Sequence, residues 1–222
     1  MRRVLIPLIF GIAGCAVLIG LGVWQVQRLA WKQGILARIE ARIAAEPVPL
    51  PAAPRETADE YRPVTLTGKL DAGALRVLVS HKRLGAGHRV IAALDTGARR
   101  VLIDRGFVSA DAAIPPPPET AVTVTGNLLW PDDRTGATPE NDVTGNMWFA
   151  RDVAQMAGVM DTAPLLIVAR TVSPPEQGVT PLPVGMRGIP NDHLSYAITW
   201  FSLAAIWAAM TGYFLWRNRG WT

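Results

Sequence analysis

The chain has 222 residues, of which 50% are hydrophobic and 18% are charged, and its formal net charge is +4. This length accommodates one folded domain together with two apolar segments of about 20 residues each. The positive charge does not indicate nucleic-acid binding, because the basic residues are spread along the chain instead of forming a basic and aromatic strip. We expect the basic residues beside the apolar segments to meet membrane lipids, and we expect no nucleic-acid partner.

The first apolar segment, residues 4–23, carries no charge and predicts a transmembrane helix after a cytoplasmic N-terminus of residues 1–3. A secretory signal is an alternative, but its apolar core has only about 7–15 residues and ends at a small-residue cleavage site, which this segment lacks. Residues 12–15 resemble the box that precedes a lipid-modified cysteine, yet residues 16–23 stay apolar after Cys15. We therefore expect a retained anchor, and the single cysteine leaves no intramolecular disulfide.

Residues 24–45 form a basic and aromatic juxtamembrane segment, which we expect to continue the helix. Trp24, Arg28, Trp31 and Lys32 fall at positions i, i+4, i+7 and i+8, so they share one helical face. This face would carry cations between indole rings. Tryptophan belts with nearby Arg and Lys also occur at the interfaces of ordinary membrane proteins, and that reading stays open.

The middle of the chain, residues 46–192, is predicted to be one extracytoplasmic β-rich domain. Runs rich in Val, Leu, Ile and Thr and bounded by Gly or Pro predict its strands, which are expected at residues 62–70, 76–80, 88–94, 99–108, 121–130 and 165–172. A short link containing Gly, residues 95–98, predicts a hairpin between two of these strands. One helix is predicted over residues 151–159, where apolar residues gather on one side.

These elements predict a membrane protein of the α+β class. Two transmembrane helices flank a mainly antiparallel β domain, which is expected to be a partly closed barrel with one helix. Residues 46–54 and 115–118 are rich in proline and are predicted to be spacers or surface loops without regular ladders.

The second apolar segment, residues 193–216, predicts the second transmembrane helix, and residues 217–222 are its cytoplasmic tail. Basic residues lie in both short tails, and short tails follow the rule that Lys and Arg stay in the cytoplasm. The basic residues after the first span favour the opposite orientation, but long domains translocate largely regardless of charge. We therefore expect both termini in the cytoplasm and the central domain in the periplasm.

The sequence carries none of the usual motifs for enzymatic chemistry: no covalent haem attachment site, zinc-protease motif, nucleophile elbow or phosphate-binding glycine loop. His81 and His88 flank a turn at residues 82–87 and are expected to be solvated rather than to bind a metal. Asp104 and Arg105 are expected to form an ion pair at a strand end. We therefore predict that the protein is not an enzyme and has no catalytic residues.

The start of the second apolar segment contains more candidate binding residues than the central domain does. His193, Tyr196, Trp200, Leu203 and Trp207 recur at spacings of three and four and so share one helical face. If the two spans pack side by side, this face and the juxtamembrane cluster meet at the same leaflet. Together they offer a neutral imidazole for iron, aromatic walls for a macrocycle, and two cations for propionates. This inventory suits haem, although an aromatic belt explains the same spacing.

Several motifs occur in order along the chain: Trp24-Gln25-x-x-Arg28 with Trp31-Lys32, Glu46-Pro47-Val48-Pro49-Leu50, Tyr61-Arg62-Pro63-Val64, Asp104-Arg105-Gly106-Phe107-Val108, Trp148-x-x-Arg151-Asp152, and Asn191-x-His193-Leu194-x-Tyr196-x-x-Thr199-Trp200. In this combination the chain resembles the surfeit locus protein 1 family, assembly factors of cytochrome c oxidase. The resemblance runs from Trp24 to the C-terminus. It departs at Asp192, which is often Asn or Glu in relatives, and at Pro190.

The resemblance implies a protein of the bacterial cytoplasmic membrane or the mitochondrial inner membrane that assists haem a delivery to oxidase subunit I; we expect the bacterial inner membrane. The family's histidine corresponds to His193, which is expected to be an axial ligand of a transiently and non-covalently bound haem a. The other expected haem-binding residues are Trp24, Gln25, Arg28, Trp31, Lys32, Tyr196 and Trp200. Haem b or haem o stays open as the cargo, and haem a synthase is a second candidate partner. The alternative is a scaffold that holds subunit I or the synthase without touching haem, and a third class, a membrane-anchored periplasmic enzyme, lacks a catalytic constellation.

Overall fold

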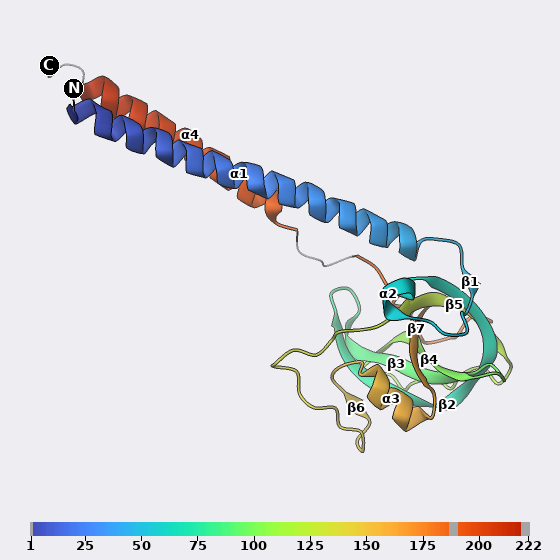
Figure 1. Ribbon diagram of the computed structural model, residues 1–222. Coiled ribbons are helices and arrows are strands. Elements are labelled where there is room, and N and C mark those ends of the chain that lie inside the picture. Colours follow the sequence, from blue (N-terminus) through green and yellow to red (C-terminus); the bar gives the residue numbers. More distant parts are fainter. Residues whose placement is uncertain (1, 187–190, 219–222) are drawn as a thin grey trace. The chain divides into compact units, whose positions relative to one another are not determined.

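The computed structural model describes residues 2–186 and 191–218 (Figure 1). It contains two compact units, one formed by Met1–Arg38 with Met186–Thr222 and the other by Ile39–Gly185. Pro190, where the sequence departs from the family pattern, lies outside the described residues, as does most of the predicted C-terminal tail.

The first unit is a pair of long helices, α4 (His193–Arg217) and α1 (Arg2–Ile43) as far as Arg38; the last turn of α1 belongs to the second unit. Both are long and apolar enough to cross a membrane, judged by length and composition. They contain the predicted spans, and α1 continues through the juxtamembrane segment to Ile43 without a break. Figure 1 shows them side by side, with the start of α1 and the end of α4 at the same end of the pair. The two helices are therefore antiparallel.

Small residues of α1 allow the close packing of this pair. A Cβ atom added at Gly22 would lie 2.6 Å from Cε1 of Phe201, and added atoms at Gly11 and Gly14 would also overlap α4 side chains. Trp207 donates a hydrogen bond from Nε1 to the carbonyl oxygen of Gly11 at 3.1 Å. Without water, helices associate mainly through such packing and interhelical hydrogen bonds, and small residues are therefore enriched at the contact.

The second unit is built on a seven-stranded mixed sheet with the order β1-β2-β3-β4-β7-β5, in which β6 pairs with β2 and β2 also pairs with β5. The strands are β1 (Val48–Pro49), β2 (Pro63–His81), β3 (Gly85–Asp95), β4 (Arg100–Ser109), β5 (Val122–Leu129), β6 (Met147–Trp148) and β7 (Ala163–Ser173). Two short helices accompany them, α2 (Glu56–Asp59) and α3 (Val153–Met160). Asp152 caps α3 by accepting a hydrogen bond from the Gln155 N–H at 3.0 Å.

The pairing is mainly antiparallel, as predicted, and parallel pairing is confined to the shorter ladders β1–β2, β2–β6 and β4–β7. Two other aspects of the predicted domain need correction. The two strands predicted over residues 62–70 and 76–80 are one strand, β2, whose register shifts between Leu70 and Ala74; such a bulge lets the strand continue through the polar residues that suggested a break. The domain also contains α2, a second helix that was not predicted.

The proline-rich segment at residues 46–54 was predicted to carry no ladder, which is wrong for Val48 and Pro49. These residues pair in parallel with Val64 and Thr65 of β2. Proline is tolerated there because β1 lies at the end of the strand order, where its missing N–H is not needed by a further strand.

The core of this unit lies on both faces of β4. Val101 and Ile103 belong to one buried cluster, whereas Leu102 belongs to another that includes Trp148 of β6 and Met156 of α3. Successive side chains of a strand point to opposite faces, so a strand covered on both sides reads as a continuous apolar run. This explains why β4 is buried along almost its whole length.

The last turn of α1 is tied to the sheet by its backbone. The carbonyl oxygen of Ile43 accepts hydrogen bonds from Arg170 Nη2 at 2.7 Å and from Asn127 Nδ2 at 3.1 Å. Carbonyl groups in the last turn of a helix have no partner within the helix, and these two side chains satisfy one of them. All three residues belong to the second unit.

The segment after β7 returns to lie along β4. Phe107 N donates to Thr180 O at 2.7 Å, and Thr180 N donates back to Phe107 O at 2.9 Å. The approach depends on Gly106, whose φ is +129° and where an added Cβ would lie 2.8 Å from the Cα of Pro181. We refer to Glu176, Val179 and Thr180 with their intervening residues as the strap.

Candidate functional site

His193 is the first residue of α4 and is half-buried. Its ring atom Nδ1 lies 2.7 Å from the side-chain oxygen Oε1 of Gln25 in α1. Gln25 is buried, with 8% of its surface exposed. Both residues belong to the same compact unit although they are 168 positions apart in the chain. One of the predicted haem-binding residues, Gln25, is therefore in direct contact with the predicted ligand.

The packing of the two helices explains why Gln25 reaches His193. Gly11, Cys15 and Gly22 each contact α4, and Gln25 continues the same series on α1. The steps between these positions are four, seven and three residues, which keeps all of them on one helical face. The Gln25–His193 contact is thus part of the seam between the helices.

The aromatic and basic residues of the juxtamembrane segment are more exposed than Gln25. Trp24 and Trp31 are 50% and 54% exposed, so neither is buried in the seam. The guanidinium carbon of Arg28 lies 4.3 Å from the ring centroid of Trp31, a cation–π contact of the kind that the sequence predicted. Lys32 is half-buried. The segment therefore presents two indoles and a stacked cation beside the seam.

The residues of the predicted aromatic face of α4 also differ from one another in exposure. Tyr196 is 56% exposed, whereas Trp200 is half-buried. Trp207 uses its indole N–H to bond the backbone of α1 and so serves the helix contact. The structure brings together Gln25 with His193 and Arg28 with Trp31, and it places Trp24 and Tyr196 at exposed positions.

The spacing of aromatic residues along each helix did not predict the contact between Gln25 and His193. The available signal was the spacing of small residues, since Gly11 and Gly22 mark the side of α1 on which Gln25 also lies. Spacing within one helix predicts which residues share a face, but it does not predict which residue of a distant helix meets them.

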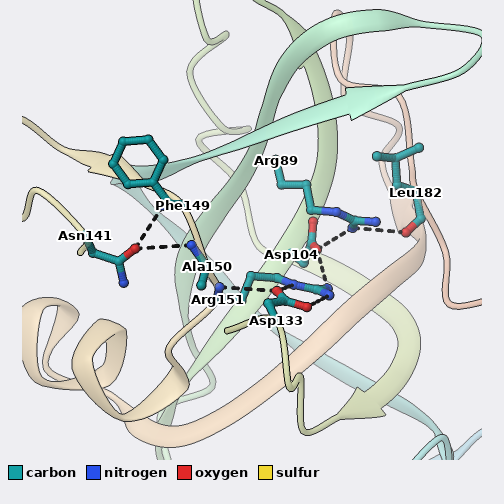
Figure 2. A network of polar contacts seen from close by, with 8 residues as sticks. All are labelled: Arg89, Asp104, Asp133, Asn141, Phe149, Ala150, Arg151 and Leu182. Atoms are coloured by element: carbon teal, nitrogen blue, oxygen red, sulfur yellow. Dashed lines mark hydrogen bonds and ion pairs between the residues drawn. The ribbon is translucent and has the colours of Figure 1, made fainter. Parts of the chain in front are cut away.

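A second polar cluster lies inside the sheet unit (Figure 2). Asp104 is fully buried, and its Oδ2 lies 2.6 Å from Arg89 Nη1 and 3.7 Å from Arg151 Nη1. Arg151 also binds Asp133 through two bonds, Nε to Oδ2 at 2.6 Å and Nη2 to Oδ1 at 3.0 Å. Arg89 reaches the carbonyl oxygen of Leu182 at 3.3 Å. The cluster thus joins β3, β4, the loop before β6 and the segment that follows the strap.

The ionisation of this cluster follows from burial and charge. Burial raises the pKa of Asp104, and the nearby Arg89 and Arg151 offset only part of this effect. Burial would also raise the pKa of Asp133, but its hydrogen bonds and charge attraction to Arg151 outweigh burial and lower that pKa. Paired, hydrogen-bonded charges of this kind are typical of structural networks. In the part of the chain that the structure describes, no group of three or more His, Cys, Asp or Glu side chains could hold a metal ion.

Two sequence predictions about polar residues in this unit are wrong. Asp104 and Arg105 do not pair at a strand end, because neighbours in a strand point to opposite faces; Arg105 instead bonds Glu176 of the strap, with Nε to Oε2 at 2.7 Å. His81 ends β2 and His88 lies within β3, so the turn between them is shorter than the predicted residues 82–87, and both side chains are half-buried and not fully solvated. Burial, together with the charge of Arg76, lowers the pKa of His88.

Comparison with known proteins adds independent information. A family model described as the SURF1 family matches residues 12–205. The chain is 33% identical to human "Surfeit locus protein 1" over 213 residues, which cover 84% of the chain and 70% of the human protein. It is 31% identical to the mouse protein of the same name over 212 residues, covering 84% and 68%. It is 34% identical to a "SURF1-like protein" of Monosiga brevicollis over 215 residues, covering 86% and 80%.

Proposed function

The chain belongs to the SURF1 family, and from this premise we propose that it is a cytochrome c oxidase assembly factor that binds haem a transiently and assists its insertion into oxidase subunit I. The observation that carries the proposal is the position of His193. This residue is a half-buried imidazole at the first position of an apolar helix long enough to cross a membrane. Ionisable residues within membrane-spanning segments are rare and often functional, and His193 is the first residue of this candidate span.

The residues present fit one axial position of a haem. A histidine nitrogen is a common protein ligand of haem iron. The chain has three histidines, and His81 and His88 belong to the other compact unit, so His193 is the candidate in the helix pair. When bound, haem a supplies an iron that accepts an axial nitrogen and two propionates that accept hydrogen bonds from cations. A single axial ligand suits transfer, because the cargo must leave again.

Residues beside the seam could bind the propionates and the ring faces of the haem. Arg28 carries a guanidinium group that forms bidentate bonds with carboxylates, and its contact with Trp31 keeps that group near an aromatic surface. Lys32 adds a second positive charge four positions further along α1. We assign the aromatic walls to Trp24, Trp31, Tyr196 and Trp200.

The proposal includes a place in the cell. The two apolar helices cross the bacterial inner membrane with both ends in the cytoplasm, and the sheet unit lies in the periplasm. The proposed partners are oxidase subunit I, haem a synthase as a second candidate, and membrane lipids. Catalysis is not part of the proposed role, and the polar cluster around Asp104 is explained by structural ion pairing.

The experiment is a comparison of absorption spectra. The protein is purified in detergent from cells that make haem a, beside His193→Ala and the matched control His81→Ala, which changes a half-buried histidine of the sheet unit. We expect a haem a spectrum in the wild type and in His81→Ala, and its loss or shift in His193→Ala. Added imidazole should restore part of the His193→Ala spectrum. A colourless, folded wild-type protein would overturn haem binding.

The alternative is a scaffold that holds subunit I without binding haem. The exposed positions of Trp24 and Tyr196 favour this scaffold, because exposed aromatic residues at a membrane interface form a belt without binding haem. Co-purification of subunit I separates the two functions. The haem proposal expects His193→Ala to retain subunit I while losing haem, whereas the scaffold expects a haem-free wild type that retains subunit I.

A further inference from the structure

The contact between Gln25 and His193 has a defined direction. The atom of Gln25 that faces the ring is the carbonyl oxygen Oε1, at 2.7 Å from His193 Nδ1. A carbonyl oxygen has no hydrogen and can only accept, so the proton must be on Nδ1. In a neutral imidazole the other nitrogen, Nε2, then has no proton and keeps its lone pair.

We infer that Gln25 is a positioning residue that holds His193 in the Nδ1–H tautomer and so presents Nε2 to the haem iron. This inference rests on the proposed function and names the residue that prepares its ligand. Histidines that bind metals almost always donate their other ring N–H to an acceptor, which fixes both the tautomer and the orientation of the ring. Gln25 supplies such an acceptor before any haem arrives.

The surroundings of Gln25 make it a fixed acceptor. It is buried in the seam, where Cys15 and Gly22 of the same face also meet α4. Burial keeps water from competing for the bond, and a distance of 2.7 Å is at the short end of the range for an N–H to oxygen bond. Gln27, two positions later on α1, is exposed and gives a matched comparison.

The chemistry of the acceptor also matters for reversible binding. Many metal-binding histidines donate to a carboxylate, which raises the basicity of the ligand. Gln25 is neutral, so it fixes the tautomer but raises the basicity of the imidazole less than a carboxylate would. This combination orients the ligand while keeping the iron bond weak enough for haem to be passed on.

The first test reads the tautomer without haem. The full chain is labelled with 15N-histidine, and nitrogen chemical shifts are recorded for the wild type, Gln25→Met, Gln25→Glu and Gln27→Met, with His193→Ala to identify the signal. We expect Nδ1–H in the wild type, in Gln27→Met and in Gln25→Glu, whose oxygen can still accept. Gln25→Met should lose the preference. An Nε2–H signal in the wild type, or an unchanged signal in Gln25→Met, would overturn the inference.

The second test titrates ferric haem a, solubilised in the same detergent, into these variants. Loss of an outer-shell partner typically weakens metal binding by about 10–100-fold, and we expect this weakening in Gln25→Met. Gln25→Glu should bind haem at least as tightly as the wild type, because a carboxylate acceptor raises the basicity of the ligand, and this result would also show that position 25 tolerates substitution. Gln27→Met should match the wild type. Equal affinity in Gln25→Met and the wild type would refute the positioning role. A wild type that binds no haem refutes the proposed function instead, because the tautomer measurement contains no haem.

Discussion

The ion pair between Arg105 and Glu176 makes a quantitative prediction about the strap. The side chains are only 1% and 6% exposed, and Glu176 Oε2 lies 2.7 Å from both Nε and Nη2 of Arg105. Replacing one partner of a buried pair leaves an uncompensated charge and typically costs about 3–5 kcal/mol. We expect Glu176→Gln to cost about 3 kcal/mol, at the low end of that range.

The low end follows from the geometry of the pair. Within the described residues, Arg105 Nη1 and Glu176 Oε1 have no hydrogen-bond partner, so the charges are already incompletely satisfied. Arg105 also keeps one bond in the variant, from Nη2 to the carbonyl oxygen of Pro115 at 3.2 Å. The expected loss still lowers the ratio of folded to unfolded protein by roughly two orders of magnitude.

The assay is urea unfolding of the full chain in detergent, read by pulse proteolysis. The free energy of unfolding is compared between the wild type, Glu176→Gln, Arg105→Leu and the double variant Arg105→Leu with Glu176→Leu. Replacing both members of a buried ion pair by apolar residues is often neutral, so the double variant should be more stable than either single one. A loss below about 1 kcal/mol in Glu176→Gln, the size expected for an exposed pair, would refute the reasoning.

Three further outcomes are expected. Gly22→Leu should lower the thermal unfolding temperature in detergent, because the added side chain overlaps a ring of α4, whereas Gly20→Leu should not, since nothing lies within 4 Å of its added Cβ. Gly106→Ala should cost about 1–3 kcal/mol in urea unfolding, because its positive φ is strained for alanine, and a smaller loss would contradict the close approach of the strap. Hydrogen bonds from the backbone N–H of Arg55 and from Arg62 lower the pKa of Asp59 below 3.8, so its stabilisation is present above that pH and is lost as the pH falls through the folded value. A titration of unfolding free energy between pH 5 and 2 should therefore be flatter in Asp59→Asn, and identical curves would refute this assignment.

Much of the architecture could be read from the sequence because length and hydrophobicity determine it. Two uncharged runs predicted the two long helices, and runs rich in Val, Ile and Thr predicted β3, β4, β5 and β7. The bulge in β2 was not predictable in the same way. Asp71 and Gly73 resemble a strand end locally, and only pairing with β3 on either side shows that the strand continues.

The candidate site was predicted in its residues but not in its contacts. His193 and Gln25 were both expected to bind haem, yet nothing in the spacing of either helix determines that they meet. The contact depends on the register between α1 and α4, which is set by Gly11 and Gly22 against large side chains of the other helix. The salt bridge between Arg105 and Glu176 could not be predicted for the same reason. The two residues are 71 positions apart, and how the strap folds back onto β4 determines whether they meet.

The separation of Gln25 and His193 has a consequence for the order of events during synthesis. The two residues are 168 positions apart, and His193 lies close to the end of the chain. At about 5–20 residues per second, a ribosome needs roughly 8–34 seconds to pass from one to the other. The residues of the sheet unit, which ends at Gly185, are all translated before His193. A product that stops before His193 therefore carries the sequence of the sheet unit and α1, but it lacks the contact between Gln25 and His193.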